Sequence, residues 1–491
     1  MTRLRSLAHL PPTVRRPAYD RATLRVGMAH LGVGAFHRCH QAEFTDDMLE
    51  ARFGRWGIAG IALRPPAPDA LAAQHGLYTR VLRDGGQSDA RVIGCHLRSV
   101  DSRASAGPAL AVLAAADVDV VTLTVTEKGY CHRPADGAPD EANPDLAHDR
   151  AHPTAPRSVP GVLARALELR RRTHGRPITL VSCDNIPGNG AILARAVGAL
   201  AGPRLADWMA TNAAFPSTMV DRIVPATTAA DLDAIEATYG YRDEAAVGGE
   251  PFRQWVIERR FAGRAPPWDL AGAELVDDVT PHERLKMRVL NAAQTTLASL
   301  GVLAGHEHTF DAVADPALAA FTRAMLATES ILTLAPVPGT DPAAYLDRSL
   351  ARIANTAVRH RCHQIATDGS QKLPQRLVGP AAERLRTGRP IARLAVAIAA
   401  WMAYLVRASD RFGRQWPVED PEAARVAAVA GRAGDDPAGL VAGILALDTV
   451  FDPALAVRED FRAPLAAALR GLLSADPTAV VRAALQDRET A

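Results

Sequence analysis

The sequence predicts an α/β protein in which a parallel sheet flanked by helices precedes a mainly helical domain. In the first half, short apolar runs that are often β-branched alternate with longer helix-like stretches, a pattern typical of a parallel sheet with helices on its faces. From about residue 277 onward, long Ala-, Leu- and Arg-rich stretches dominate, and few runs look like strands. The 491 residues exceed the ~100–200 of a usual domain, which also favours more than one domain.

The individual elements follow from the same patterns. Short, apolar runs predict buried strands at 26–31, 57–63, 118–125 and 178–183. The stretches between them predict helices at 41–51, 107–116 and 159–173. The segment 133–156, rich in Pro, Asp and His, predicts a long surface loop. We expect residues 1–276 to form the sheet domain and residues 277–491 the helical domain.

Composition excludes several classes of protein. A net charge of +2 with interspersed charges is not the footprint of a nucleic-acid-binding protein. The most apolar run, 394–406, is shorter than the ~20 residues of a membrane span, so it predicts a buried helix. The five cysteines lie far apart without a C-x-x-C pair, and the N-terminus has no signal-peptide core, so we expect a cytoplasmic protein with reduced thiols.

A glycine-rich turn follows the first expected strand and opens a helix. Gly32 and Gly34 have the first two spacings of a dinucleotide fingerprint, which permits a tight turn and brings backbone N–H groups close to a pyrophosphate. His37 occupies the place of the third glycine. The position of this turn on the first strand favours a Rossmann-type cofactor site. Arg38 is either part of the phosphate clamp or a solvated helix residue.

The second expected strand leads into Arg64, where an acidic residue usually holds the ribose of NAD. A guanidinium there accepts a 2′-phosphate or stacks on the adenine. We expect NAD as the cofactor, and Arg64 leaves NADP possible.

A polar stripe marks the helix expected to begin near Pro281. At about 100° per residue, Asn291 lies about 140° and Gln294 about 80° from Lys286, while the leucines and valines of this segment fall on a separate arc. Oxidation of a secondary alcohol needs a base for the hydroxyl proton and donors for the alkoxide, and a lysine with amides supplies both. The alternative is an ordinary first helical turn with Lys286 in solvent and Asn291 satisfying a loop.

Six phrases now occur in order along the chain: HLGVGAFHRCH at 30–40, TVTEKGY at 124–130, SCDNIPGNG at 182–190, MVDRIVP at 219–225, EPFRQWVIE at 250–258 and DGSQKLPQR at 368–376. Together they resemble the long-chain, metal-independent mannitol dehydrogenase family, which includes mannitol 2-dehydrogenases and fructuronate reductases (D-mannonate oxidoreductases). The resemblance runs from about residue 20 to beyond 400. It implies a Rossmann-type N-terminal domain and a mainly helical C-terminal domain, 6-phosphogluconate-dehydrogenase-like in fold.

The resemblance also implies roles for particular residues. The family's K-x4-N-x2-H signature falls on Lys286, Asn291 and Gln294, with Lys286 as general acid/base and Asn291 as an alkoxide donor. Asn185, in the Ser-Cys-Asp-Asn phrase, is implied as the second donor. Residues implied on the cofactor side are Gly32, Gly34, Ala35, Phe36, Arg38 and Glu127, and those implied on the substrate side are Lys372 and Arg376.

Gln294 departs from the family pattern, which has histidine here. Both side chains can donate an N–H to a carbonyl oxygen, but glutamine cannot titrate. Three outcomes follow: a dehydrogenase with altered substrate fit, which we favour, a slower enzyme, or a nucleotide-binding protein without turnover. Lys128 is a rival lysine whose neighbours suggest a nicotinamide contact or a salt bridge instead.

The expected substrate is a sugar alcohol oxidised to a ketose, with a hexonate as the alternative, because several phrases are also typical of fructuronate reductases. A carboxylate substrate would need a fixed cation such as Arg361, Arg376 or Lys372. The first His-Arg-Cys-His phrase lies in the nucleotide turn, and His306-Glu-His308 has no fourth ligand at recognised spacing, so we expect no metal. A single chain can hold such a site, so we expect a monomer or a weak homo-oligomer.

Overall fold

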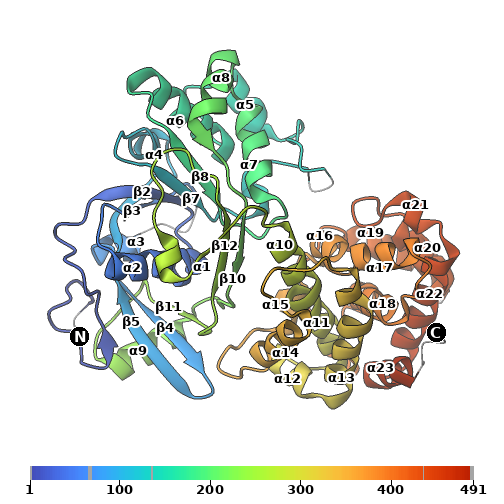
Figure 1. The fold of residues 1–491 in the computed structure, drawn as a ribbon. Helices are drawn as coiled ribbons and strands as arrows, with labels where there is room; N and C mark the ends of the chain where they lie inside the picture. Colours follow the sequence, from blue (N-terminus) through green and yellow to red (C-terminus); the bar gives the residue numbers. More distant parts are fainter. Residues whose placement is uncertain (1–2, 65–68, 134–135, 435, 487–491) are drawn as a thin grey trace. The chain divides into compact units, whose positions relative to one another are not determined.

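The computed structural model describes residues 3–64, 69–133, 136–434 and 436–486, and the chain divides into two compact units, Met1–Thr280 and Pro281–Ala491. The first unit holds the strands of a parallel sheet with helices around it, and the second is mostly helical (Figure 1). The predicted fold class is therefore confirmed. No helix among the described residues is long and apolar enough to cross a membrane.

Six parallel strands form the main sheet of the first unit, in the order β6-β3-β2-β7-β8-β9. Their bounds are β2 Val26–Leu31, β3 Gly57–Ala62, β6 His96–Asp101, β7 Val120–Leu123, β8 Ile178–Ser182 and β9 Ala213–Ala214. The chain leaves β2 toward β3 on one side and later returns to β7 on the other. This reversal is the switch point at whose carboxyl edge open α/β sheets bind ligands.

Both faces of this sheet are covered, because side chains of each strand alternate between two apolar clusters. In β2, Ala29 and Leu31 face one cluster while Met28 faces the other. The first cluster is closed by α4 (Gly107–Leu113), α6 (Val159–Thr173), α7 (Asn189–Gly198) and α8 (Pro203–Asn212), and the second includes residues of α2 (Gln41–Ala51), which follows the short α1 (Ala35–Cys39). The doubly covered sheet explains why its strands read as continuous apolar runs.

Several elements of this unit were not predicted. The loop expected at 133–156 contains α5 (Pro144–Ala151), whose first amides donate to the Asn143 side chain at 3.0 and 3.3 Å. That prediction is wrong because Asn-Pro at a helix start resembles a turn in sequence. Two further sheets have the orders β1-β5-β4-β11 and β10-β12-β13, and α3 (Asp69–Ala73) and α9 (Ala229–Tyr239) complete the unit. The strands are β1 Val14–Arg15, β4 Tyr78–Asp84, β5 Gln87–Ile93, β10 Thr218–Asp221, β11 Val247–Gly249, β12 Gln254–Glu258 and β13 Glu274–Val276.

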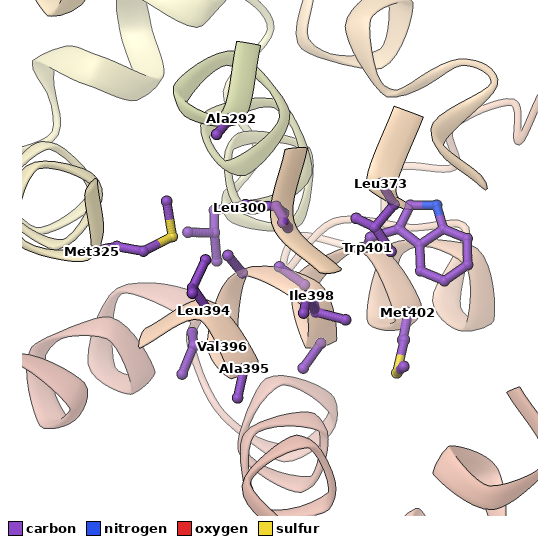
Figure 2. Packing of buried hydrophobic residues seen from close by; sticks show 14 of the residues in the cluster. Ala292, Leu300, Met325, Leu373, Leu394, Ala395, Val396, Ile398, Trp401 and Met402 are labelled. Carbon is purple, nitrogen blue, oxygen red and sulfur yellow. The ribbon is translucent and has the colours of Figure 1, made fainter. Parts of the chain in front are cut away.

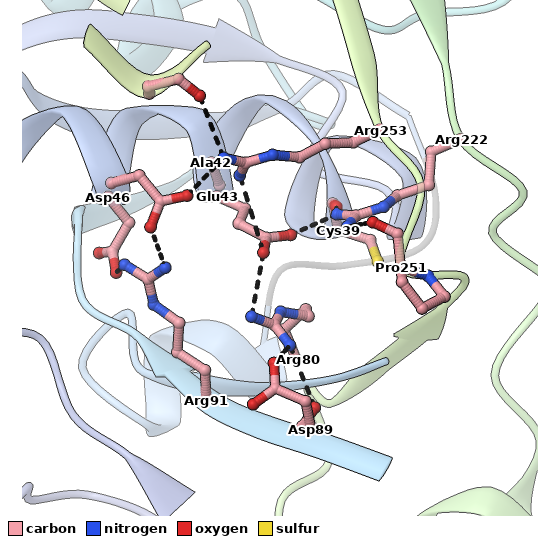
Figure 3. Close-up of polar contacts among 12 residues, drawn as sticks. Cys39, Ala42, Glu43, Asp46, Arg80, Asp89, Arg91, Arg222, Pro251 and Arg253 are labelled. Atoms are coloured by element: carbon pink, nitrogen blue, oxygen red, sulfur yellow. Dashed lines mark hydrogen bonds and ion pairs between the residues drawn. The ribbon is translucent and has the colours of Figure 1, made fainter. Parts of the chain in front are cut away.

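Buried ion pairs fix α2, the helix that comes directly after the glycine turn and α1 (Figure 3). Glu43 lies 3.0 Å from Arg80 of β4 and also pairs with Arg222, which follows β10. Asp46 pairs with Arg91 of β5. Buried charges are tolerated only when paired, so these contacts join α2 to strands from distant parts of the sequence.

The second unit is organised around two buried helices, α11 (Ala292–Ala304) and α18 (Ala392–Arg407). Leu300 of α11 and Leu394, Ile398 and Trp401 of α18 belong to one core cluster (Figure 2). The predicted buried helix at 394–406 is thus confirmed. The other helices are α10 Thr280–Lys286, α12 Thr309–Ala314, α13 Pro316–Met325, α14 Pro342–Ile353, α15 Cys362–Ala366, α16 Gly369–Leu373, α17 Gly379–Arg386, α19 Ala423–Ala433, α20 Pro437–Leu445, α21 Pro453–Ala456, α22 Glu459–Ser474 and α23 Pro477–Gln486.

Wide π-helical turns interrupt the helices of this unit at three places within its described part. They are η3 (Met287–Asn291) between α10 and α11, η4 (Leu326–Ser330) after α13, and η6 (Pro374–Val378) between α16 and α17. Such turns are rare and frequently occur at functional sites.

Candidate active site

The glycine turn lies at the carboxyl end of β2. Gly32 has a φ of +89°, its N–H donates to the Ile61 carbonyl at 3.0 Å, and a Cβ there would overlap the Thr124 carbonyl oxygen. Gly34 has an ordinary φ of −76°, and a Cβ at this position would meet nothing within 4 Å. Gly32 is therefore required by the turn itself, whereas the space in front of Gly34 is open for a ligand.

Three buried histidines lie beneath this turn. The ring of His37, in the place of the third fingerprint glycine, stacks on His30 with centroids 3.3 Å apart, and its Nε2 lies 2.9 Å from Nε2 of His96. His30 Nε2 lies 3.0 Å from the Gly32 carbonyl oxygen and 2.9 Å from Thr124 Oγ1. Burial lowers the pKa of His30 and of His96 to about 3, so both are neutral at pH 7. Aromatic stacking thus replaces the close glycine packing of the usual fingerprint.

A pocket of about 790 Å³ opens at this edge of the sheet. Of the residues expected on the cofactor side, Gly32, Gly34 and Arg38 line it. The Arg38 guanidinium donates to the carbonyl oxygens of Gly34, at 3.3 Å, and of Ala245. The remaining lining residues are Val33, Ala62, Leu63, Arg64, Ala70, Leu71, Thr124, Val125, Thr126, Lys128, Gly129, Cys131, Asn143, Asp145, Val159 and Glu244. The open backbone at Gly34 and the fixed cation nearby suit a pyrophosphate.

Three other residues expected on the cofactor side are not among the residues that line this pocket. Ala35 and Phe36 form the first turn of α1, where the Phe36 ring stacks on His40 at 5.0 Å. Glu127 begins the 3-10 turn η1 (Glu127–Tyr130), in which its neighbours Lys128 and Gly129 line the pocket.

Arg64 lies in the pocket wall and pairs with Asp145 of α5 at 2.7 Å. The pair offers a carboxylate, which suits a ribose hydroxyl, and a guanidinium, which suits a 2′-phosphate. Asp145 was not singled out from the sequence, because it lies in the segment expected to be a loop.

Asp184, immediately before Asn185, holds the chain that follows β7. Its carboxylate accepts hydrogen bonds from the amides of Val125 and Thr126, at 3.0 and 2.9 Å, and from the Tyr130 hydroxyl at 2.6 Å. Thr126 has a φ of +64°, an uncommon conformation for a non-glycine residue. Sequence reasoning missed Asp184, although its place directly after a buried strand was a usable signal. Asn185 itself is exposed.

The helix of Lys286 differs from the continuous α-helix expected from the sequence. Lys286 ends α10, residues Met287–Asn291 form the π turn η3, and Gln294 lies in the first turn of α11. A π turn adds one residue to the helical turn, so Lys286 and Asn291 lie closer together around the helix axis than the roughly 140° of a continuous α-helix. Gln294 is three α-helical residues after Asn291, on a neighbouring part of the same surface. The π turn therefore brings these three positions nearer to one face than the simple helical wheel does.

Arg376, from η6, lies against this helix. Its Nη1 donates to Thr295 Oγ1 at 2.9 Å and lies 3.5 Å from the Asn291 carbonyl oxygen. Lys372 is turned elsewhere, and its ammonium donates to the carbonyl oxygens of Ile365, at 3.1 Å, and Thr367, at 2.5 Å. Lys286 and Asn291 are buried, and Gln294 is partly buried.

Two further observations concern metal binding and cysteine nucleophiles. Within the described ranges, no group of three or more His, Cys, Asp or Glu side chains is arranged to hold a metal ion. All five cysteines are free and buried, which leaves none of them at the surface as a nucleophile.

Comparison with known proteins finds relatives of both units of the chain. Residues 26–270 match the family model of the mannitol dehydrogenase Rossmann domain, and residues 278–473 match that of the mannitol dehydrogenase C-terminal domain. The D-mannonate oxidoreductase of Escherichia coli K12 is 39% identical, with 94% of this chain and 96% of the relative covered. The uncharacterized oxidoreductase YeiQ of the same organism is 40% identical over 90% of this chain and 91% of its own length.

A solved structure of a mannitol dehydrogenase is similar to this chain over its length. Mannitol 2-dehydrogenase from Pseudomonas fluorescens, in a ternary complex with NAD and D-mannitol, superposes with a TM-score of 0.91 at 34% identity, and 99% of each chain is covered. The two family models together span both units of the chain. The chain therefore belongs to the mannitol dehydrogenase family of oxidoreductases.

Proposed function

We propose that the protein is an NAD(P)-dependent dehydrogenase that interconverts a secondary alcohol of a sugar alcohol and the corresponding ketose. The observation that carries this proposal is the π turn, because it brings Lys286, Asn291 and Gln294 toward one helical face. A base beside amide donors is what the removal of a proton from an alcohol requires. The mannitol 2-dehydrogenase that the chain resembles was solved with NAD and D-mannitol, which supports both the cofactor and the substrate class.

The cofactor residues belong to the first unit. Gly32 forms the turn, the open backbone at Gly34 receives the pyrophosphate, and Arg38 adds a positive charge beside it. We further propose that residues 1–276 form the domain that binds the cofactor. Residues 277–491 form the domain that carries the catalytic lysine. When bound in this site, a nicotinamide would supply the acceptor for the hydride of the alcohol carbon.

The chain's own residues handle the proton and the developing charge. Lys286, with its amine neutral, accepts the proton of the substrate hydroxyl. Asn291 donates an amide N–H to the alkoxide, and Gln294 takes the part of the family histidine as a second amide donor. Asn185 keeps the donor role that the family resemblance implies for it. In the reverse direction, protonated Lys286 returns its proton to the oxygen of the reduced ketone.

A hexonate oxidised at the same kind of carbon is the second candidate. Arg376 lies beside the proposed catalytic face with its guanidinium at Thr295 and Asn291, where it could pair with a substrate carboxylate. The 39% identity to a D-mannonate oxidoreductase, against 34% to the mannitol 2-dehydrogenase of known structure, also favours this alternative.

A panel of assays that follow reduction of the cofactor separates these two candidate substrates. Mannitol, sorbitol, arabinitol and mannonate are each supplied with NAD⁺ and with NADP⁺, and formation of the reduced cofactor is followed by absorbance. We expect turnover of at least one polyol, with NAD⁺ preferred. Turnover of mannonate alone would replace the polyol proposal by the hexonate one. Tight cofactor binding without turnover of any of the four would contradict both.

A further inference from the structure

The π turn η3 is held by side chains from two other interrupted helices. Ser330, the last residue of η4, is fully buried, and its hydroxyl donates to the carbonyl oxygen of Arg288 in η3 at 2.6 Å. Arg376 of η6 approaches the carbonyl oxygen of Asn291, the last residue of η3. A π turn is less favourable than the α-helix it interrupts, so neighbouring groups must offset its cost.

The Arg288 side chain strengthens the same connection. Its guanidinium donates to the Thr333 carbonyl and hydroxyl oxygens at 3.0 and 2.8 Å, and the Thr333 hydroxyl donates to the carbonyl oxygen of Ser330 at 2.7 Å. The guanidinium also forms two bonds to Glu383, of 2.7 and 2.6 Å, which hold the pKa of that carboxyl below its usual value. Backbone and side chain of one η3 residue are therefore both tied to the segment 330–333.

We propose that Ser330 is a positioning residue for the reaction. Its hydroxyl keeps η3 in the π conformation and thereby keeps Lys286 on the same helical face as Asn291. The proposal rests on the proposed function, in which these two side chains act on one hydroxyl group. If η3 became α-helical, Lys286 would lie about 140° from Asn291 around the helix axis.

The chain offers a matched control in Ser349 of α14. This serine is also buried and also donates its hydroxyl to a backbone carbonyl oxygen, that of Tyr345, at 2.8 Å. The bond stays within α14 and does not join it to η3. Ser330→Ala and Ser349→Ala therefore delete the same chemical group from equally buried sites, and only the first should affect the π turn.

The experiment compares the two variants with the full-length wild-type protein. For Ser330→Ala we expect kcat to fall about tenfold or more, because a misplaced base loses much of its contribution. We also expect an unchanged Kd for NADH, a shifted pH dependence of kcat, and faster amide exchange in residues 287–291. Ser349→Ala should leave all four readouts near the wild-type values. Thermal unfolding of both variants verifies that they remain folded.

Three results would overturn the proposal. The first is unchanged exchange at 287–291 in Ser330→Ala, which would mean that the hydroxyl does not hold the turn. The second is faster exchange in Ser330→Ala while kcat and its pH dependence stay unaffected. The third is an equal loss of kcat in Ser349→Ala. Failure of the proposed function is separate: it would appear as a wild-type protein inactive on the whole substrate panel, and amide exchange would still decide whether Ser330 holds η3.

Discussion

The glycine turn and the Lys286 helix differ in where their unusual backbone is encoded. At the turn, Gly32 adopts a positive φ that other residues avoid, and its neighbours in sequence complete the structure. In the helix, no residue from 287 to 291 demands a π turn, and the contacts to it come from Ser330 and Arg376, far along the chain. A locally encoded geometry is visible in sequence, whereas one imposed by tertiary contacts is not.

The two regions also differ in their electrostatics. The turn rests on neutral buried histidines, which stack and hydrogen-bond without charge. The helix carries charged and polar side chains instead: the Arg288 guanidinium pairs with Glu383, and Arg376 donates to Thr295. Variants in each region therefore test the step that its chemistry implies.

The largest effect is expected from the Lys286 helix. Lys286→Ala should lower kcat by roughly 10²–10⁴-fold, the usual contribution of a general base, without changing the Kd for NADH. Steady-state kinetics and a fluorescence titration with NADH measure the two quantities. A kcat within tenfold of the wild-type value would remove Lys286 from the chemistry and make Lys128 the lysine to test next.

Substitutions of the two glycines of the turn should separate an effect on stability from an effect on cofactor binding. Gly32→Ala places a Cβ against the Thr124 carbonyl at a positive φ, so we expect a loss of about 2 kcal/mol or more in the free energy of unfolding. Gly34→Ala meets nothing within 4 Å in the protein, so its unfolding should be nearly unchanged. If a pyrophosphate approaches this backbone, the Kd of Gly34→Ala for NADH should rise about tenfold. Equal behaviour of the two variants in denaturant titrations would contradict this distinction.

Acid should weaken the region of the turn selectively. The pKa of His30 and of His96 is about 3 in the folded protein, against 6.5 in the unfolded chain, so below pH 6.5 the unfolded state binds more protons. The stabilisation is complete above pH 6.5 and is lost as the pH falls toward 3, by about 1.4 kcal/mol per pH unit for each histidine. His96→Gln should therefore reduce the slope of the unfolding free energy between pH 6.5 and 5. A slope identical to that of the wild type would show that His96 does not contribute.

The smallest effect is expected at Gln294. Gln294→His restores a side chain that donates at a similar position, so we expect turnover of mannitol-like substrates to rise several-fold. Because histidine titrates near pH 6.5, the variant should also gain a dependence on pH in that range. No gain in turnover, with Lys286→Ala still inactive, would indicate that glutamine is adapted to another substrate.

Much of the fold could be predicted because its patterns are local. The strand β2 and the helices α2 and α6 have the predicted bounds, since continuous apolar runs and helical periodicity identify such elements. The hairpin of β4 and β5 was missed because its strands carry many charges, among them Arg80 and Arg91, which become buried only through pairing with α2. Burial of a charge depends on its partner, and the partner is not adjacent in sequence.

The candidate site likewise has one part that the sequence predicts and one part that it does not. The sequence by itself determined that Gly32 makes a tight turn after the first strand, because only glycine tolerates that conformation beside a carbonyl group. It also determined the order of lysine, asparagine and glutamine along one helix. How near they lie to one face, by contrast, was decided only by the tertiary structure, since the π turn between them is stabilised by hydrogen bonds from residues 42 and 85 positions away.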